Sequence, residues 1–291
     1  MELIEKADSR KLYSHVEFLT GLYPPRNYRN TESLDRAADY IAAEFKKYGC
    51  RTSEQSYRAD HSTYRNIIGS AGPVNGPLLV VGAHYDVAGE QPGADDNASA
   101  VAGLLETARL LAYQELKIRV DFVAYPLEEP PYFGSSKMGS AVHAESLYNA
   151  GEEVIIMICF EMIGYFSDTP GSQTHPHDMK AEHYPDTGNY VGVTGIEKYD
   201  WWIQKFASLM SRYTSIPVEN ACFASPFSVV SLSDQRNYWK YNYPAIMITD
   251  TSYFRNPYYH TPGDTIDTLD FERMAEVVDG TAGALLELAR L

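Results

Sequence analysis

The feature that most constrains the fold is an apolar run that ends abruptly in a polar triplet. Residues 78–83 are almost wholly apolar, and His84, Tyr85 and Asp86 follow them directly. A short run of this composition is typical of a strand that is buried on both faces of a sheet. In open α/β sheets, ligands bind outside the carboxyl ends of such strands. The triplet therefore predicts a functional site at one edge of a sheet.

More acidic and imidazole side chains follow at the ends of later predicted elements. Each segment alone is a weak signal, because a single histidine is often structural and paired glutamates are usually solvated. Their order along the chain, with every member at the same predicted sheet edge, is much harder to obtain by chance. Imidazole and carboxylate side chains on strand-end loops are what a hydrolytic metal site requires. The candidates are His84 with Asp86, Asp95 with Asp96, Glu128 with Glu129, Glu161, and His260.

Strand-like and helix-like segments alternate along most of the chain, which predicts an α/β fold. We expect a three-layer α/β/α domain with a central mixed, mostly parallel sheet, formed as one unit by residues 1–291 with a long substrate-side loop at about 165–198. Short apolar runs predict strands at 64–69, 78–83, 118–125, 154–160 and 245–249. Helical spacing predicts helices at 34–49, 101–111, 136–149, 199–213, 234–241 and 271–288.

The composition narrows the classes of partner. The formal charge of −15 argues against a nucleic-acid or anionic-membrane surface. No run of about 18 apolar residues occurs, so we expect no membrane span. Three cysteines without CxxC spacing form neither a disulfide framework nor a cysteine zinc site. Residues 1–6 lack the apolar stretch of a signal peptide, which indicates a cytoplasmic location, or secretion if a leader has been removed.

The polar segments and their flanking residues resemble the co-catalytic di-zinc aminopeptidases, the metallopeptidase family that includes aminopeptidase Y. The resemblance covers roughly residues 78–270 and implies the zinc exopeptidase fold. The matching stretches, all in the family's order, are Gly82–Asp86, Gly93–Ser99, Leu127–Glu129, Glu161–Tyr165, Ser233–Gln235 and Tyr259–Thr265.

The resemblance implies two Zn²⁺ ions per chain, for which Mn²⁺ or Co²⁺ could substitute. His84 would bind one ion, and Asp86 would orient its imidazole, as metal-bound histidines usually require. Asp95 would bridge both ions, and Asp96 would follow it across a cis peptide bond.

Three further side chains would complete the set of ligands. Glu161 would bind the first ion, and Glu129 and His260 the second. Glu161 departs from the aspartate that is more familiar in the family, so its longer side chain must approach from farther back or bind through both oxygens. Three carboxylates against two Zn²⁺ leave the cluster cationic, which favours an activated water and a polarised carbonyl.

Glu128 would then be the general base, because by the family's pattern it adjoins a ligand without being one. Tyr259 could donate a hydrogen bond to the oxyanion or simply pack beside His260. Aromatic residues in the later loops predict a preference for an apolar or aromatic first residue of the substrate. These residues are Phe223, Phe227, Tyr253, Phe254 and Tyr258.

The predicted function is that of an aminopeptidase acting on peptides with a free amino terminus. A dipeptidase or carboxypeptidase of the wider superfamily stays open, as does the oligomeric state. One alternative is a glutaminyl cyclase-like acyltransferase, which resembles this fold but works with one zinc ion. Another is a binding domain of the same fold that has lost catalysis. The complete set of ligands and the presence of Glu128 favour the two-metal hydrolase over both alternatives.

Overall fold

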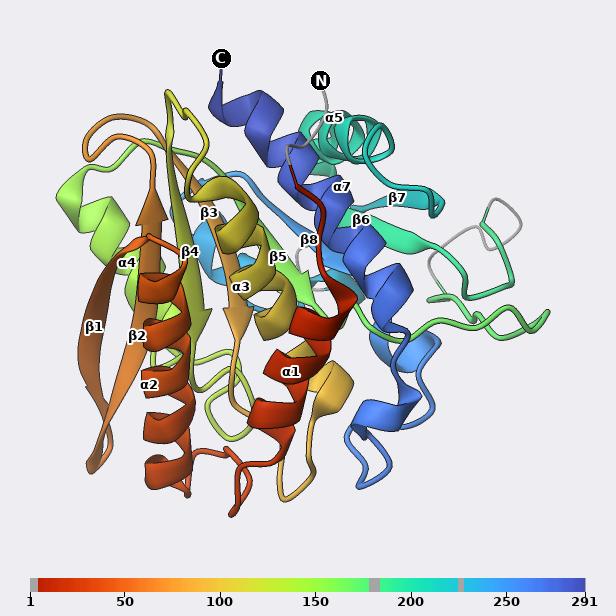
Figure 1. The fold of residues 1–291 in the computed structure, drawn as a ribbon, viewed down its shortest axis with the longest axis horizontal. Coiled ribbons are helices and arrows are strands. Elements are labelled where there is room, and N and C mark those ends of the chain that lie inside the picture. The colour runs from red at the N-terminus through yellow and green to blue at the C-terminus, as the bar shows by residue number, and fades with distance from the viewer. Residues whose placement is uncertain (1–4, 178–183, 225–227, 291) are drawn as a thin grey trace.

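The computed structural model describes residues 5–177, 184–224 and 228–290. Eight strands form one mixed sheet in the order β1-β2-β4-β3-β5-β8-β6-β7. The strands are β1 (Arg51–Ala59), β2 (Ser62–Ala71), β3 (Leu78–His84), β4 (Arg119–Tyr125), β5 (Val154–Glu161), β6 (Val191–Ile196), β7 (Val218–Phe223) and β8 (Ala245–Thr249). The central strands β4, β3, β5 and β8 are parallel neighbours, so their carboxyl ends meet at one edge of the sheet (Figure 1).

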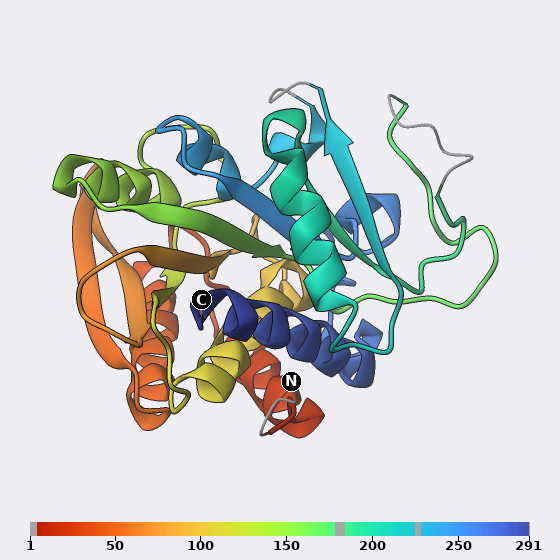
Figure 2. The same cartoon turned by 90° about the horizontal axis from the view of Figure 1, so that it is seen from above.

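Helices cover both faces of this sheet, as Figures 1 and 2 show from two directions. One face packs against α1 (Ser9–Thr20), α2 (Thr31–Lys47), α3 (Ala100–Leu111), α5 (Asp200–Met210) and α7 (Phe271–Ala289). The other face packs against α4 (Gly139–Ala150) and α6 (Gln235–Trp239). The strand β5 serves both layers, because Ile158 and Phe160 face the first set of helices while Met157 and Cys159 face the second. The predicted three-layer α/β/α fold is confirmed.

The burial of the central strands explains why the polar residues of the site lie at the strand ends. All seven residues of β3 are buried, and β4 is buried from Val120 to Tyr125. Such strands carry mostly apolar side chains on both faces, and β3 has no polar side chain before its last residue. The polar chemistry therefore starts with His84, the last residue of β3, and with Glu161, the last residue of β5.

Every helix and strand predicted from the apolar patterns is present, but four α-helices and strands of the described residues were missed. These are α1, β1, β6 and β7. Strand β1 is an edge strand with mostly polar, exposed side chains, and it therefore shows no apolar pattern. Strand β6 contains Gly192 and Gly195, which interrupt its apolar run. The predicted loop at 165–198 is consequently too long, because residues 191–196 form β6 and residues 197–199 a helical turn.

None of the helices in the described ranges is long and apolar enough to cross a membrane.

Candidate metal centre

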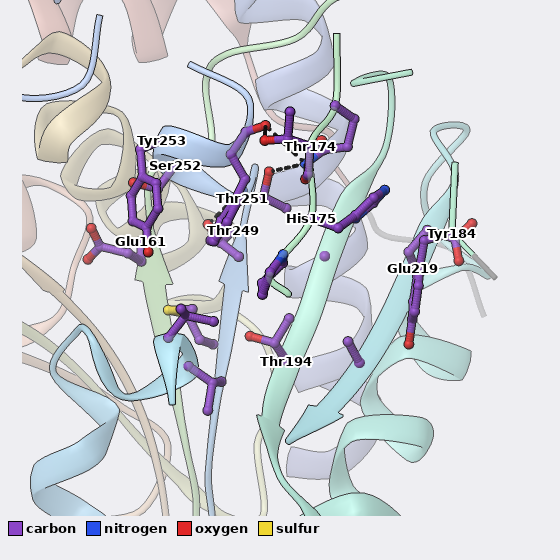
Figure 3. A pocket seen from close by; sticks show the side chains of 18 of the residues that line it. Glu161, Thr174, His175, Tyr184, Thr194, Glu219, Thr249, Thr251, Ser252 and Tyr253 are labelled. Atoms are coloured by element: carbon purple, nitrogen blue, oxygen red, sulfur yellow. Dashed lines mark hydrogen bonds between the residues drawn. The ribbon is translucent and has the colours of Figure 1, made fainter. Parts of the chain in front are cut away.

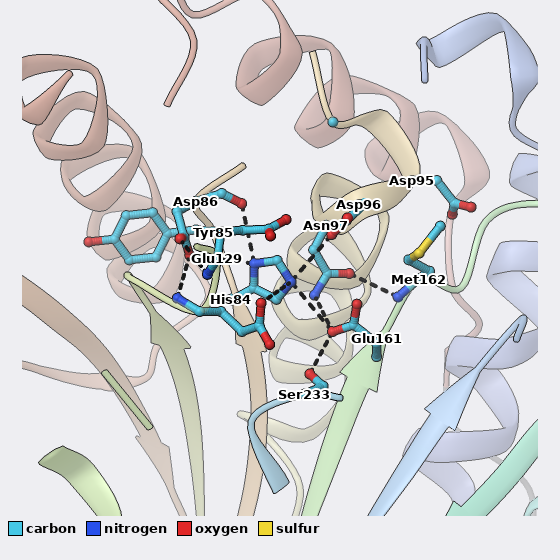
Figure 4. A network of polar contacts seen from close by, with 12 residues as sticks. His84, Tyr85, Asp86, Asp95, Asp96, Asn97, Glu129, Glu161, Met162 and Ser233 are labelled. Carbon is cyan, nitrogen blue, oxygen red and sulfur yellow. Dashed lines mark hydrogen bonds and ion pairs between the residues drawn. The ribbon is translucent and has the colours of Figure 1, made fainter. Parts of the chain in front are cut away.

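The parallel strands bring the predicted polar residues to one place (Figure 4). His84 and Glu161 end β3 and β5, and the segment after β4 carries Glu129. Asp96 lies in the irregular turn at residues 94–99 before α3, and His260 lies in the loop after β8. Two groups could each hold a metal ion, with candidate ligand atoms within 4.8 Å of one another. They are His84 with Asp96 and Glu161, and Asp96 with Glu129 and His260.

Asp96 is the residue that the two groups share. Its Oδ1 lies 3.4 Å from His84 Nε2, and its Oδ2 lies 3.0 Å from His260 Nε2. The remaining members lie at similar distances, with Glu161 Oε2 3.4 Å from His84 Nε2 and Glu129 Oε1 3.2 Å from His260 Nε2. One carboxylate oxygen thus faces each group, which is the arrangement of a bridging ligand between two cations.

The prediction that Asp95 bridges the ions is wrong. Its Oδ1 accepts a hydrogen bond from the Gly164 N–H at 3.0 Å, and its Oδ2 accepts one from Asn256 Nδ2 at 2.7 Å. Figure 4 shows Asp95 well away from His84. The cis peptide bond joins Asp96 to Asn97 rather than Asp95 to Asp96. The bridging position belongs to Asp96, the next residue, because adjacent side chains of this turn point in different directions.

The pKa values of Asp95 and Asp96 shift in opposite directions. Burial and the charge of Asp250 raise the pKa of Asp95 well above its usual range, and Asp95 shares a hydrogen bond with Asp250. Burial also works against the charged form of Asp96, but hydrogen bonds from His260 and His84 outweigh it and lower its pKa. A metal ligand must be deprotonated. The lowered pKa of Asp96 favours the deprotonated form, whereas the raised pKa of Asp95 disfavours it.

Two further carboxylates hold the backbone on which the site is built. Asp86 Oδ1 and Oδ2 each accept a backbone N–H at 3.1 Å, from Glu128 and Glu129 respectively. Asp86 Oδ1 also lies 3.5 Å from His84 Nδ1, and the Asp86 carbonyl oxygen lies 3.2 Å from it. Asp86 therefore orients the imidazole and fixes the Glu128–Glu129 backbone together.

Asp264 holds the backbone on the other side of the site, as Asp86 holds it at Glu128 and Glu129. Its two carboxylate oxygens accept the backbone N–H groups of Asp95, at 2.8 Å, and of Asp96, at 3.1 Å. Burial and the charge of Asp95 raise the pKa of Asp264 to about 7. Sequence reasoning did not assign it a role, although it lies four residues after His260 inside a stretch that matches the family.

Arg26 is a second contributor that the sequence did not reveal. The side chain is 1% exposed, and its guanidinium donates to the carbonyl oxygens of Tyr85, Leu19, Pro92 and Gly93 at 2.5–3.2 Å. Burial lowers its pKa to about 10, and nearby carboxylates that include Asp264 oppose this shift. Arg26 ties α1 to the polar triplet and to the loop that follows it, far from any motif that would have marked it.

Glu161 reaches its position with the help of neighbouring side chains. Ser233 Oγ donates a hydrogen bond to Glu161 Oε2 at 2.6 Å, and Asn97 Nδ2 lies 3.4 Å from the same oxygen. This is the oxygen that faces His84 Nε2. The longer glutamate is thus held with one defined oxygen in the group, which answers the geometric question raised by its replacement of aspartate.

The electrostatics of the site favour a cation. Burial opposes protonation of His84, but Glu161, Asp86 and Asp96 outweigh it and raise its pKa well above the usual value. At His260 burial is likewise outweighed, by Asp96 and Glu129, and the pKa rises to about 10. His84 Nε2, Asp96 Oδ1 and Glu129 Oε1 are buried without a hydrogen-bond partner. Buried polar atoms left unpaired are costly, so their convergence fits a bound metal.

Glu128 differs from its neighbour Glu129 in belonging to neither group. Its Oε2 lies 4.0 Å from His84 Nε2, and its Oε1 is buried without a hydrogen-bond partner. Burial, together with the charges of Glu129 and Glu161, raises the pKa of Glu128 well above its usual range. A buried carboxyl group with a raised pKa beside a metal centre is suited to accept and return a proton.

Tyr259 stacks on the imidazole of His260, with ring centroids 3.8 Å apart and an interplanar angle of 18°. Burial and the charge of Asp96 raise the pKa of its hydroxyl, so the hydroxyl remains a hydrogen-bond donor at neutral pH. Tyr259 and Glu161 also line a cavity beside the centre. Of the aromatic residues predicted to shape the substrate site, Phe223, Tyr253 and Phe254 line this cavity, whereas Phe227 lies outside the described residues.

Comparison with known proteins places these observations in a family. The model of peptidase family M28 matches residues 66–285. The Escherichia coli (strain K12) protein YfbL, described as uncharacterized, is 44% identical over 94% of this chain and 86% of its own length. Leucine aminopeptidase 1 of Blastomyces gilchristii (strain SLH14081) is 23% identical over 99% of this chain and 73% of its own.

Solved structures agree in fold. A zinc aminopeptidase from Bacillus subtilis superposes with a TM-score of 0.78 at 16% identity and covers 100% of this chain and 97% of its own. The glutaminyl cyclase of Porphyromonas gingivalis gives a TM-score of 0.74 at 21% identity, over 97% and 99% of the two chains. The resemblance stated from the sequence motifs is confirmed by the family match and by the shared fold.

Proposed function

Because this chain belongs to peptidase family M28, we propose that it is an aminopeptidase that uses two Zn²⁺ ions to hydrolyse the amino-terminal peptide bond. The observation that carries the proposal is the shared position of Asp96, whose two oxygens face two separate groups of ligands. Leucine aminopeptidases among the relatives and zinc aminopeptidases among the similar structures support the same reaction.

The residues present fit two such ions. His84, Asp96 and Glu161 would hold one, and Asp96, Glu129 and His260 the other. Imidazole nitrogen and carboxylate oxygen suit zinc, and Mn²⁺ or Co²⁺ could replace it. When bound, the ions would supply Lewis-acid polarisation of the scissile carbonyl and lower the pKa of water. Asp86 would keep the His84 ring in its binding orientation.

The chain's own groups would handle the protons. Glu128 would take a proton from the attacking water and return it to the leaving amine, as its burial beside the two groups allows. The Tyr259 hydroxyl would donate a hydrogen bond to the oxyanion that forms at the scissile carbon. The free amino group of a peptide would sit near the carboxylates of the site, and a blocked terminus would not fit the same position.

The single-zinc acyltransferase is the strongest competing proposal, because a glutaminyl cyclase shares the fold. Two complete groups of ligands argue for two ions instead. A binding domain without catalysis would be expected to lack the base or a ligand, and this chain retains Glu128 and all the proposed ligands. Metal content and substrate type separate the three proposals.

The decisive experiment measures zinc per chain and the hydrolysis of amino-acid arylamides, with and without a chelator. We expect close to two zinc ions, cleavage that chelation abolishes, and no cleavage of the same arylamides with acetylated amino groups. One zinc ion with cyclisation of amino-terminal glutamine would establish the acyltransferase instead. Zinc binding without turnover of either substrate would indicate the binding domain.

A further inference from the structure

A cavity that Glu161 and Tyr259 help to line lies beside the metal centre. Figure 3 shows Glu161 at one side of it and Glu219, next to Tyr184, at the other. Strands β8 and β6 run between these two glutamates, so the cavity extends from the metal centre towards the outer strand β7. A substrate side chain that enters from the centre would therefore point towards Glu219.

The strand registers show how the floor of this cavity is built. Glu161 pairs with Thr249, Thr249 with Gly192, and Gly192 with Glu219. Directly paired residues present their side chains on the same face of a sheet. With neighbouring strands ~4.8 Å apart, three spacings separate the Cα atoms of Glu161 and Glu219 by about 14 Å. The two glutamates thus mark the ends of one row across the floor.

The middle of this row is open. Gly192 has no side chain, and a Cβ atom placed there would meet nothing closer than the Thr249 carbonyl oxygen at 3.4 Å. The next row of the floor consists of Met247, Thr194 and Ala221. The upper walls are largely apolar and come from Val229, Val230, Leu232, Tyr253 and Phe254. This space fits a long, unbranched and mostly apolar stem.

The far end of the cavity carries the Glu219 carboxylate, and no lysine or arginine of the described residues lies beside it. Among residues 5–177, 184–224 and 228–290, no hydrogen bond or ion pair engages the Glu219 carboxylate, and the cavity lining contains no lysine or arginine. Thr194 Oγ1, on the floor, is buried without a hydrogen-bond partner. A carboxylate at the end of an apolar space attracts a cation, because the low surrounding polarity strengthens the interaction.

We propose that this cavity receives the side chain of the substrate's first residue and that Glu219 selects a cationic one, arginine or lysine; this proposal rests on the aminopeptidase function. Both side chains bury an apolar stem and carry their charge at the tip. The sequence predicted an apolar or aromatic first residue. The apolar walls fit the stem of such a side chain, but a cationic end at Glu219 replaces that expectation.

The test compares arginine, citrulline and alanine arylamides, since citrulline has nearly the shape of arginine without its charge. A charge-assisted hydrogen bond predicts a kcat/KM for arginine about ten- to a hundredfold above that for citrulline. In Glu219→Gln the ratio of arginine to citrulline falls towards one. In the control Glu17→Gln, an exposed acid on α1 in the opposite layer, the ratio stays at the wild-type value. A ratio near one in the wild type, or unchanged in Glu219→Gln, overturns the proposal.

A second variant tests the path to Glu219. Gly192→Leu places a side chain over the open floor without a backbone clash at Cβ. We expect it to lower the ratio of arginine to alanine turnover at least tenfold, because only the longer side chain must pass this point. An arginine-to-alanine ratio equal to that of the wild type would show that the first side chain does not enter this cavity.

Binding measurements separate failure of this proposal from failure of the aminopeptidase function. Calorimetry with argininamide and citrullinamide is expected to show tighter binding of argininamide to the wild type and equal binding to Glu219→Gln. If no arylamide is cleaved but this difference holds, the reaction is wrong and Glu219 is still a cation site. If arylamides are cleaved and both amides bind the wild type equally, the selection by Glu219 is wrong.

Discussion

The site has two regions that are built in different ways. At the ends of β3, β4 and β5, three candidate ligands (His84, Glu129 and Glu161) end or follow largely buried strands, and buried carboxylates hold the local backbone at two points. At β6 and β7, the cavity is floored by a shorter and less buried pair of strands and walled by irregular segments. The first region has the rigidity that metal geometry requires, whereas the second can vary without disturbing it.

This difference implies that metal binding and substrate choice can be changed separately. Variants in the first region should alter zinc content, the rate of the chemical step or global stability. Variants in the second should alter the ratio between substrates. The four predictions below test the first region against this expectation, from the largest expected effect to the smallest.

The largest effect is expected at the neighbouring pair Asp96 and Asp95. Asp96→Asn removes the carboxylate that both groups share, so we expect loss of zinc and a fall in kcat/KM of about a thousandfold or more. Asp95→Asn changes a side chain that belongs to neither group and disturbs only its hydrogen bonds, so zinc should stay near two per chain and activity should fall about tenfold at most. Zinc analysis and arylamide kinetics measure both. Equal loss of zinc in the two variants would contradict the assignment of Asp96.

The next effect concerns Glu128 and its neighbour. Glu128→Gln keeps the shape of the side chain but cannot accept a proton, so kcat should fall by about 10²–10⁴-fold while zinc content is unchanged. Glu129→Gln is the matched control, since it removes a proposed ligand and should lower zinc content. Normal turnover in Glu128→Gln would exclude it as the base.

The first region is also the part of the molecule that the sequence predicts well. Residues 78–83 and 154–160 predict buried strands, and the residues that follow them reach the site as expected. The polarity change at the end of a buried strand is a local signal, so it can be read from the chain alone. Which of Asp95 and Asp96 faces the two groups of candidate ligands is decided by backbone dihedral angles inside one turn, and spacing does not encode this.

The second region was predicted poorly for a related reason. The glycines of β6 and the polar residues of β7 weaken the apolar alternation that marks a strand. Glu219 reaches the cavity only through strand pairing across three neighbours, and this pairing depends on the tertiary fold. The roles of Asp264 and Arg26 were not predicted for the same reason. The partners of Asp264 lie 168–169 residues away in the sequence, and those of Arg26 lie up to 67 residues away.

The third prediction concerns the stability of the first region. Arg26→Met leaves four carbonyl oxygens without the buried donor that they share, so we expect the free energy of unfolding to fall by about 3–5 kcal/mol. Arg58→Met on the exposed edge strand β1 is the control and should change it by less than about 0.5 kcal/mol. Urea unfolding of both variants makes the comparison. A loss in Arg26→Met no larger than in Arg58→Met would show that the guanidinium does not hold these loops together.

The smallest of the four effects separates a carboxylate of the first region from one of the second. In Asp86→Asn one oxygen becomes an amide that faces a backbone N–H, so the Glu128–Glu129 backbone and the His84 ring lose their common support. We expect zinc affinity to fall about 10–100-fold, measured by competition with a chelator. Glu219→Gln should leave zinc affinity at the wild-type value, because the row of paired residues places Glu219 three strands away from Glu161. If Glu219→Gln weakened zinc as much as Asp86→Asn, the two regions would be coupled, and substrate choice could not vary independently of the metal centre.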